Sequence, residues 1–158
     1  MTLQITQEQF QFLLPLATEW AEKQEGIILQ TGISLNEKQL QDAKSAGVIK
    51  PEKIRLLKVF YIPLPDHPAL QEAAQATQLI TPRTDGLTVR YGIFIKEQHF
   101  NNRQLLAHEF IHTSQYERFG GFMPFLQQYL MECITIGYPA APMEQEAIIG
   151  AIKICNEN

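Results

Sequence analysis

Apolar residues recur at helical spacing over much of the chain, with polar residues between them. Near the N-terminus, Phe10, Leu13, Leu14 and Ala17 would share one face of a helix. Several later segments begin at asparagine or proline, which favour the start of a helix, and stop at glycine, which favours its end. The pattern predicts helices over residues 6–24, 37–47, 51–56, 67–78, 102–119 and 124–137, and from 142 nearly to the C-terminus.

Three further segments are rich in β-branched and aromatic residues, which is typical of strands. They cover residues 58–62, 79–80 and 87–95, and a turn at 83–86 precedes the last of them. The sequence therefore predicts an α+β fold, with helices packed around a small, mainly antiparallel sheet. Because no Pro- or Ser-rich linker divides the chain, residues 1–158 are expected to form a single domain.

Composition narrows the classes of function. The formal net charge is −4 and no basic cluster occurs, so nucleic acid is not an expected partner. No apolar run approaches the roughly 18 residues that span a bilayer, and the N-terminus does not resemble a secretory signal. The only cysteines, Cys133 and Cys155, exclude a disulfide framework and suit a reducing compartment. These features predict a cytoplasmic protein that does not associate with membranes.

Residues 108–112 read His-Glu-Phe-Ile-His, the H-E-x-x-H pattern. Four residues advance an α-helix by about 400°, so His108 and His112 would project from one face and could share a metal ion. Glu109 is placed beside them, where it could take a proton from a water bound to that metal.

The surroundings of the motif favour a metal site. Between Gln104 and Tyr116, Glu109 is the only formally charged residue, and the other positions are largely apolar. The helix is therefore expected to be buried on nearly all sides. A lone carboxylate in such a helix is costly unless something pairs with it. The alternative is that both histidines are core residues bound to backbone groups, with Glu109 paired to an arginine.

A catalytic zinc needs three protein ligands and one open position, and three downstream glutamates are candidates for the third ligand. In the last predicted helix, Glu144 shares the apolar face with Ala147 and Ala151. Glu146 points about 200° away from Glu144, toward the polar face, and Glu132 lies at the edge of an apolar stripe. Because a carboxylate on a buried face requires a partner, we favour Glu144 and keep Glu146 and Glu132 as alternatives.

The H-E-x-x-H segment followed by Glu144-Gln-Glu-Ala147 (E-x-x-A) resembles the zincin-like metallopeptidases, in particular the minimal gluzincins. The chain is also similar to bacterial peptidase-like domains over residues 103–151, about a third of its length. The further shared positions are Gln115, Tyr116, Arg118, Gly137, Tyr138 and the Pro-x-E-x-E-A element at 142–147.

This resemblance implies a zincin-like fold in which the H-E-x-x-H helix carries the active site. It implies that His108, His112 and Glu144 bind zinc and that Glu109 is the general base. It also implies an antiparallel edge strand over the cleft, a place that residues 87–95 occupy. The chain departs from the family in two ways: no third histidine of the metzincin type follows, and Ile148 stands where a polar residue often follows E-x-x-A.

The expected function is that of a zinc-dependent metallopeptidase acting on a peptide or protein substrate. Zinc would lower the pKa of a water molecule toward about 7, and Glu109 would accept its proton and later deliver it to the leaving amine. Tyr138 is a candidate oxyanion donor, against the simpler interpretation of a loop tyrosine packed on the core. The principal alternative is a non-catalytic protein-interaction domain on a zincin scaffold, with a structural metal or none.

Overall fold

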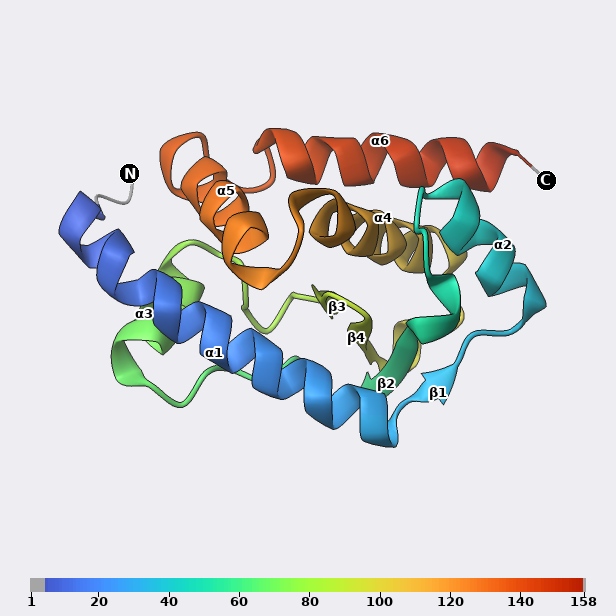
Figure 1. The fold of residues 1–158 in the computed structure, drawn as a ribbon, viewed down its shortest axis with the longest axis horizontal. Helices are drawn as coiled ribbons and strands as arrows, with labels where there is room; N and C mark the ends of the chain where they lie inside the picture. The colour runs from blue at the N-terminus through green and yellow to red at the C-terminus, as the bar shows by residue number, and fades with distance from the viewer. Residues whose placement is uncertain (1–4, 158) are drawn as a thin grey trace.

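The structure, a computed structural model, describes residues 5–157. Within that range it contains six α-helices and one mixed four-stranded sheet (Figure 1), which confirms the α+β class. The helices are α1 (Gln7–Thr31), α2 (Glu37–Ser45), α3 (Pro68–Ala76), α4 (Arg103–Phe119), α5 (Phe122–Thr135) and α6 (Pro142–Asn156). The strands are β1 (Ile33–Ser34), β2 (Arg55–Val59), β3 (Gly86–Val89) and β4 (Gly92–Lys96). None of the helices described is long and apolar enough to cross a bilayer.

The sheet has the strand order β1-β2-β4-β3. The two outer pairings are antiparallel, as expected, whereas the central pairing of β2 with β4 is parallel. β3 is therefore an edge strand, and the chain passes from it through β4 directly toward α4.

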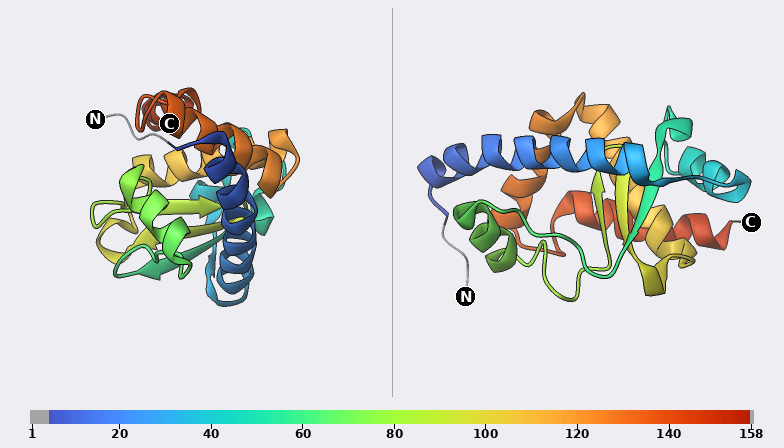
Figure 2. Two further views of the ribbon diagram at one scale, coloured as in Figure 1. Left: turned by 90° about the vertical axis from the view of Figure 1, so that its left-hand side faces the viewer. Right: turned by 90° about the horizontal axis from the view of Figure 1, so that it is seen from below.

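Helices cover both faces of the sheet, so all five residues of β4 are buried. Phe94 points into the cluster formed with α1, while Ile93 and Ile95 point into a second cluster with Leu106 and Phe110 of α4. This alternation follows from the period of two along a strand. Figure 2 shows α1 crossing the direction of the strands, and in Figure 1 α4 lies between the sheet and α6.

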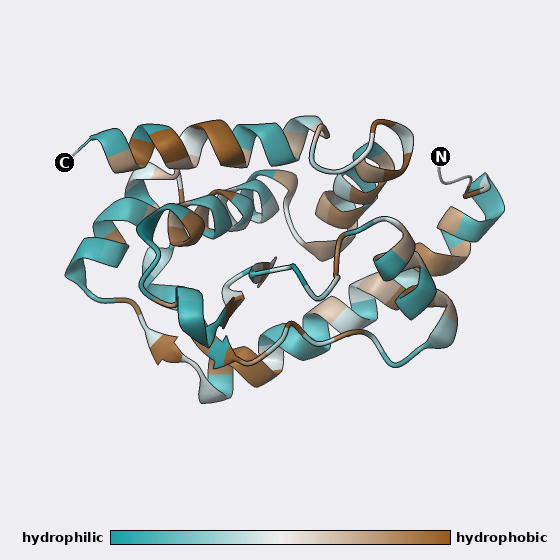
Figure 3. Cartoon of the chain, turned by 180° about the vertical axis from the view of Figure 1, so that it is seen from behind, coloured by the Kyte–Doolittle hydropathy of each residue, from teal (hydrophilic) through white to brown (hydrophobic). Residues whose placement is uncertain are grey.

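α6 packs on the outer side of α4 through small residues. Figure 3 shows apolar and polar residues alternating along α6. Ala147, Ala151 and Ile154 are buried against Ala107 and Ile111 of α4. Two helices with alanines at their contact can approach closely, and this brings the first turn of α6 to the middle of α4.

The prediction of one strand over 87–95 is wrong. The segment is a hairpin, in which Arg90 and Tyr91 form the turn between β3 and β4. Arg90 has a φ of 63°, which is uncommon for a residue other than glycine. The two turn residues are Arg and Tyr rather than the usual Asn-Gly or Asp-Gly pair of a tight hairpin, so the local sequence does not mark the turn. The next residue, Gly92, has no side chain, which lets α1 pack closely against the start of β4. A Cβ at this position would lie 3.0 Å from Ile28.

The strand predicted at 58–62 is displaced by three residues, and the strand predicted at 79–80 does not form. The register with β4 places the earlier strand at Arg55–Val59. The aromatic residues that suggested a later strand, Phe60 and Tyr61, are 85% and 73% exposed. Residues 79–80 lie in a bend after α3, and Ile80 is buried there without joining the sheet.

Two helical boundaries differ as well. α1 continues to Thr31 rather than ending near residue 24, because the buried residues Glu25 and Ile28 extend its inner face. The expected helix over 51–56 is only a 3₁₀ turn at Pro51–Lys53, since β2 begins two residues later. The other five helices lie within a few residues of their predicted places.

Candidate metal centre

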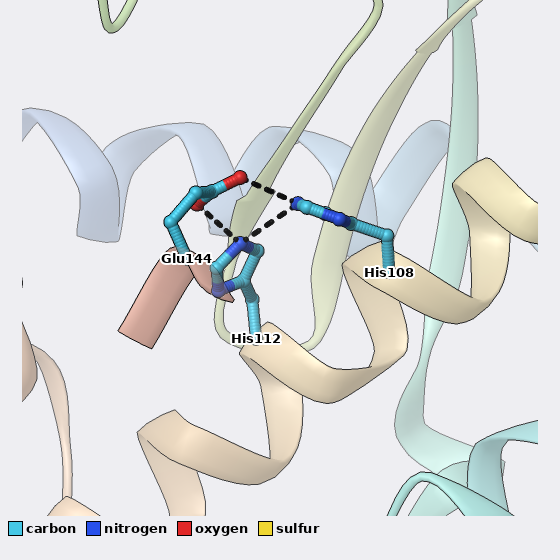
Figure 4. Close-up of side chains that lie close together, drawn as sticks. All are labelled: His108, His112 and Glu144. Atoms are coloured by element: carbon cyan, nitrogen blue, oxygen red, sulfur yellow. Dashed lines mark hydrogen bonds and ion pairs between the residues drawn. The ribbon is translucent and has the colours of Figure 1, made fainter. Parts of the chain in front are cut away.

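α4 has well-defined ends that set the positions of both histidines. The side chain of Asn102 accepts a hydrogen bond from the backbone N–H of Leu105, which caps the start of the helix. Gly120 ends it with a φ of 88°, a left-handed conformation that glycine adopts readily. Between these caps, His108 and His112 lie one turn apart and project from the same face, as Figure 4 shows.

Glu144 comes from the first turn of α6 and meets the two histidines across the α4–α6 contact (Figure 4). His108 Nε2 lies 2.7 Å from Glu144 Oε1, and His112 Nε2 lies 3.0 Å from Glu144 Oε2. The two Nε2 atoms are 3.2 Å apart. The sequence-favoured triad is therefore brought together in space, with its ligand atoms all within 4.8 Å of one another.

These distances suit a small divalent cation. Zinc binds imidazole nitrogen and carboxylate oxygen at about 2.0–2.2 Å, so adjacent ligand atoms of a tetrahedral site lie about 3.3 Å apart. The Nε2–Nε2 distance is close to that value, and the carboxylate contacts are slightly shorter. The donor set of two imidazoles and one carboxylate therefore fits zinc in both chemistry and spacing.

The electrostatics of the centre also favour a cation. Burial would raise the pKa of the Glu144 carboxyl, but its hydrogen bonds to the two imidazoles outweigh burial and hold the pKa well below its usual range. Burial would lower the pKa of His112, but Glu144, with help from Glu109 and Gln115, raises it to about 9. Without metal, the centre therefore holds a proton among the atoms that would bind the ion.

Gln115 orients the ring of His112. Its side-chain oxygen lies 2.7 Å from His112 Nδ1, and its nitrogen donates to the backbone oxygen of Met143 and to Glu146. Because the Gln115 nitrogen is committed as a donor, its oxygen accepts the proton on Nδ1. This arrangement leaves Nε2 of a neutral His112 with a free lone pair for a metal.

Tyr129 of α5 holds the third candidate ligand from the other side. Its hydroxyl donates a hydrogen bond of 2.8 Å to Glu144 Oε2. Glu144 is only 2% exposed, so this bond satisfies a carboxylate lone pair that water could not reach freely. Burial, and then the charge of Glu144, raise the pKa of Tyr129 well above its usual range, so the hydroxyl stays a donor.

The two alternative glutamates have other partners. Glu146 pairs with Arg118 at 2.7 Å and accepts from Gln115, so it supports His112 through Gln115. Glu132 accepts the backbone N–H of Met143 at 2.8 Å, and so stabilises the start of α6. Neither belongs to the His108–His112–Glu144 group among the described residues.

Glu109 points toward β3 and is held there. The hydroxyl of Thr88 donates to Glu109 Oε1 at 2.7 Å. Gly86 lies against the other carboxylate oxygen, since a Cβ at this position would be 3.1 Å from Oε2. Glu109 is buried and lines the same cavity as the three candidate ligands. Its carboxylate therefore has a defined orientation beside the centre without belonging to the ligand group.

Two hollows meet at this centre. An open groove of about 440 Å³ lies on one side and includes Arg83, Asp85 and Gly86. A deeper cavity of about 160 Å³ lies on the other side, between α1, α3, α5 and β3. His108, Glu109 and Tyr138 line both, so the centre is accessible from the groove. Tyr138 is partly exposed, and burial, followed by the charge of Glu144, raises its pKa, which keeps its hydroxyl protonated.

Sequence reasoning missed two residues and assigned no role to a third. Tyr129 and Thr88 contact Glu144 and Glu109 from other elements, and nothing in their local sequence marks them. The resemblance includes Gln115 but gives it no role. Its spacing of three from His112 places it on the same helix face and was the one available signal.

No protein-family model matches this chain, and no curated protein or solved structure matches it either.

Proposed function

We propose that the protein is a zinc-dependent peptidase with a zincin-like active site. The observation that carries this proposal is the meeting of His108, His112 and Glu144 at one point, with Glu109 held beside them. Two imidazoles and one carboxylate are a common ligand set of catalytic zinc, which leaves a fourth position for water or substrate. The groove along His108 gives that position access to solvent.

The surroundings of α4 also support a zincin-like arrangement. β3 is an antiparallel edge strand that precedes α4 and runs past Glu109. The third candidate ligand comes from a later helix that packs along α4, as in the gluzincins that the sequence resembles. The departure at Ile148 does not touch the ligand set, because that residue lines the outer groove.

Each residue has a defined part in the proposed reaction. A zinc ion bound here would polarise the substrate carbonyl and make water more acidic. Glu109 accepts the proton of the attacking water and returns it to the leaving amine, a general acid–base role that suits a carboxylate fixed by Thr88. Gln115 and Tyr129 hold His112 and Glu144 in the ligand geometry. Tyr138 can donate a hydrogen bond to the developing oxyanion from the rim of the groove.

The decisive experiment compares the wild type with Glu109→Gln. Glutamine keeps the size of the side chain but accepts no proton, so we expect about one zinc per chain to be retained and peptide hydrolysis to fall by about 10²–10⁴-fold. New peptide termini in a host lysate are counted after exposure to each form. Glu19→Gln, on the exposed side of α1, is the matched control.

Termini that appear with the wild type and the control, but not with Glu109→Gln, support a peptidase. An absence of new termini with zinc-loaded wild type, across pH and metal conditions, would contradict the proposal. That result would favour the non-catalytic interaction domain.

A further inference from the structure

The deeper of the two hollows has an unusual distribution of polarity. Its walls are almost entirely hydrocarbon, and the groups that could bind a metal or move a proton lie together at one place on its lining. Representative wall residues are Leu14, Ala17, Ala74, Leu87, Leu126 and Leu130.

The threonine hydroxyls of the wall are already satisfied by the protein. The hydroxyl of Thr77 donates to the backbone oxygen of Ala73 at 2.7 Å, and that of Thr84 donates to the oxygen of Leu79 at 3.2 Å. The hydroxyl of Thr88 is used by Glu109. Away from the metal centre, the lining therefore offers a ligand apolar contact and little hydrogen bonding.

The cavity leaves part of the hydrophobic core incompletely covered. Leu13, Trp20, Leu130 and Ile134 pack against the main cluster but stay only partly buried, and all four line the cavity. Protein interiors normally contain few voids larger than a water molecule. An apolar group placed here would remove these side chains from water and fill the space, so its binding would be favourable.

We infer that this cavity binds an apolar group of about six carbon atoms that belongs to the substrate. A cavity of about 160 Å³ is the size of an engineered apolar cavity that holds one benzene molecule. This inference rests on the proposed function, because the reacting carbonyl of the same molecule would lie at the metal centre. The substrate class is thus a peptide-like molecule with a phenyl or hexyl-sized group next to the bond that is cleaved.

The groove on the opposite side accounts for the rest of such a substrate. It contains Arg83, Asp85 and Asn102, whose side chains suit the polar backbone and charged groups of a peptide. Because His108 and Glu109 line both hollows, one extended molecule can occupy the cavity and the groove together. The geometry predicts that the apolar group lies in the cavity and that the polar part lies in the groove near the surface.

The test uses straight-chain hydroxamates of increasing length, from two to ten carbons, bound to the zinc-loaded protein. The hydroxamate binds zinc and the alkyl chain probes the cavity. Each methylene that enters should tighten binding by about fourfold until the space is filled near six carbons, after which the affinity should level off. An affinity independent of chain length would overturn the inference.

Ala74→Leu narrows the cavity from α3, and Ala17→Leu narrows it from α1. Each should lower the affinity for the six-carbon chain by tenfold or more and move the plateau to shorter chains. Ala76→Leu, an exposed alanine of the same α3 helix, is the matched control and should change neither. Two narrowed variants that bind all chains like the control would contradict the assignment.

A zinc-free arm separates this inference from the proposed function. Benzene should raise the melting temperature of the metal-free wild type, and of Ala76→Leu, but not of Ala74→Leu. Benzene binding combined with no hydroxamate binding would support the cavity and overturn the metal centre. Hydroxamate binding that does not depend on chain length, together with no effect of benzene, would support the metal centre and overturn the cavity.

Discussion

Gln115 decides which nitrogen of His112 faces the centre. Its oxygen accepts from Nδ1, and its own nitrogen is held by Met143 and Glu146. The amide cannot turn over without losing these bonds, so the tautomer of a neutral His112 is determined by one fully buried side chain. Arg118, at the surface, forms an ion pair with Glu146 and so helps to fix the carboxylate that accepts from Gln115.

Replacing Gln115 with methionine should therefore weaken zinc binding while keeping the volume of the side chain. We expect a loss of about 10–100-fold in zinc affinity, the usual effect of removing a partner of a metal-binding histidine. A chelator competition measures it. Gln127→Met, at an exposed position of α5, is the control and should bind zinc like the wild type. Equal affinities for the two variants would show that Gln115 has no role in orienting His112.

Zinc affinity should depend on pH through His112. In the metal-free protein the pKa of His112 is raised from 6.5 to about 9, and zinc binds only neutral imidazole. Between about pH 6.5 and 9 a proton must leave before zinc binds, so affinity should rise by up to tenfold per pH unit and level off near pH 9. Chelator competition at several pH values tests this, and a flat profile would contradict the raised pKa.

The same shift has the opposite effect on the metal-free fold. A raised pKa contributes stability that is fully present below the unfolded value of 6.5 and is lost as the pH rises through about 9. The metal-free protein should thus become less stable over the range in which zinc binding strengthens. Denaturant unfolding with a chelator present measures this trend.

At the scale of elements, two contacts of α4 assemble the site. α6 brings Glu144 to the histidines across a contact of alanines and glycine. β3 brings Thr88 and Gly86 to Glu109, because the tight hairpin aligns the edge strand with the helix that follows β4. In the proposed enzyme each contact would have a different role, since the first positions the candidate ligands and the second positions the candidate base.

Gly86→Ala tests the second contact separately from the first. The new Cβ would lie 3.1 Å from Glu109 Oε2 and 3.2 Å from Ile95, so the carboxylate must shift by a few tenths of an ångström. We expect zinc to be retained and kcat/KM on a peptide cleaved by the wild type to fall by about 10–100-fold.

Gly26→Ala is the control for the glycine substitution. Position 26 is an exposed site in α1 with no atom near its added Cβ. This change should leave kcat/KM unaltered and stabilise the fold by about 0.5–1 kcal/mol. A loss of zinc in Gly86→Ala would instead mean that β3 also supports the ligands.

At the scale of the molecule, the metal would tie the two long C-terminal elements together. His108 and His112 lie in α4 and Glu144 lies in α6, so a bound ion would add a link between helices that already meet through apolar packing and through the polar contacts of Glu146. Any ligand that binds only the folded state raises its stability by mass action.

Zinc at 100 times its Kd should therefore stabilise the fold by about 2.7 kcal/mol, which raises the melting temperature of a domain of this size by about 5–10 °C. Differential scanning calorimetry with zinc and with a chelator measures the shift. Glu144→Gln should abolish most of it, whereas Glu146→Gln should retain most of it. The reverse ranking would show that Glu146, and not Glu144, is the third ligand.

Much of the centre followed from the sequence because its geometry is local to single helices. The helical period places His108 and His112 on one face, and Asn102 and Gly120 define the helix that carries them. The same period separates Glu144 from Glu146, and the structure buries the first and pairs the second with Arg118. The α+β class followed from the alternation of helical and strand-like segments.

Other features were decided only by tertiary structure. The turn at Arg90 has no local signature, and the register of β2 depends on its pairing with β4 rather than on its own composition. The bonds from Thr88 to Glu109 and from Tyr129 to Glu144 join residues of different elements. The cavity likewise exists only where six elements, α1, α3, β3, α4, α5 and α6, meet. Such contacts depend on how whole elements pack, and the spacing of residues along one helix or strand contains no information about them.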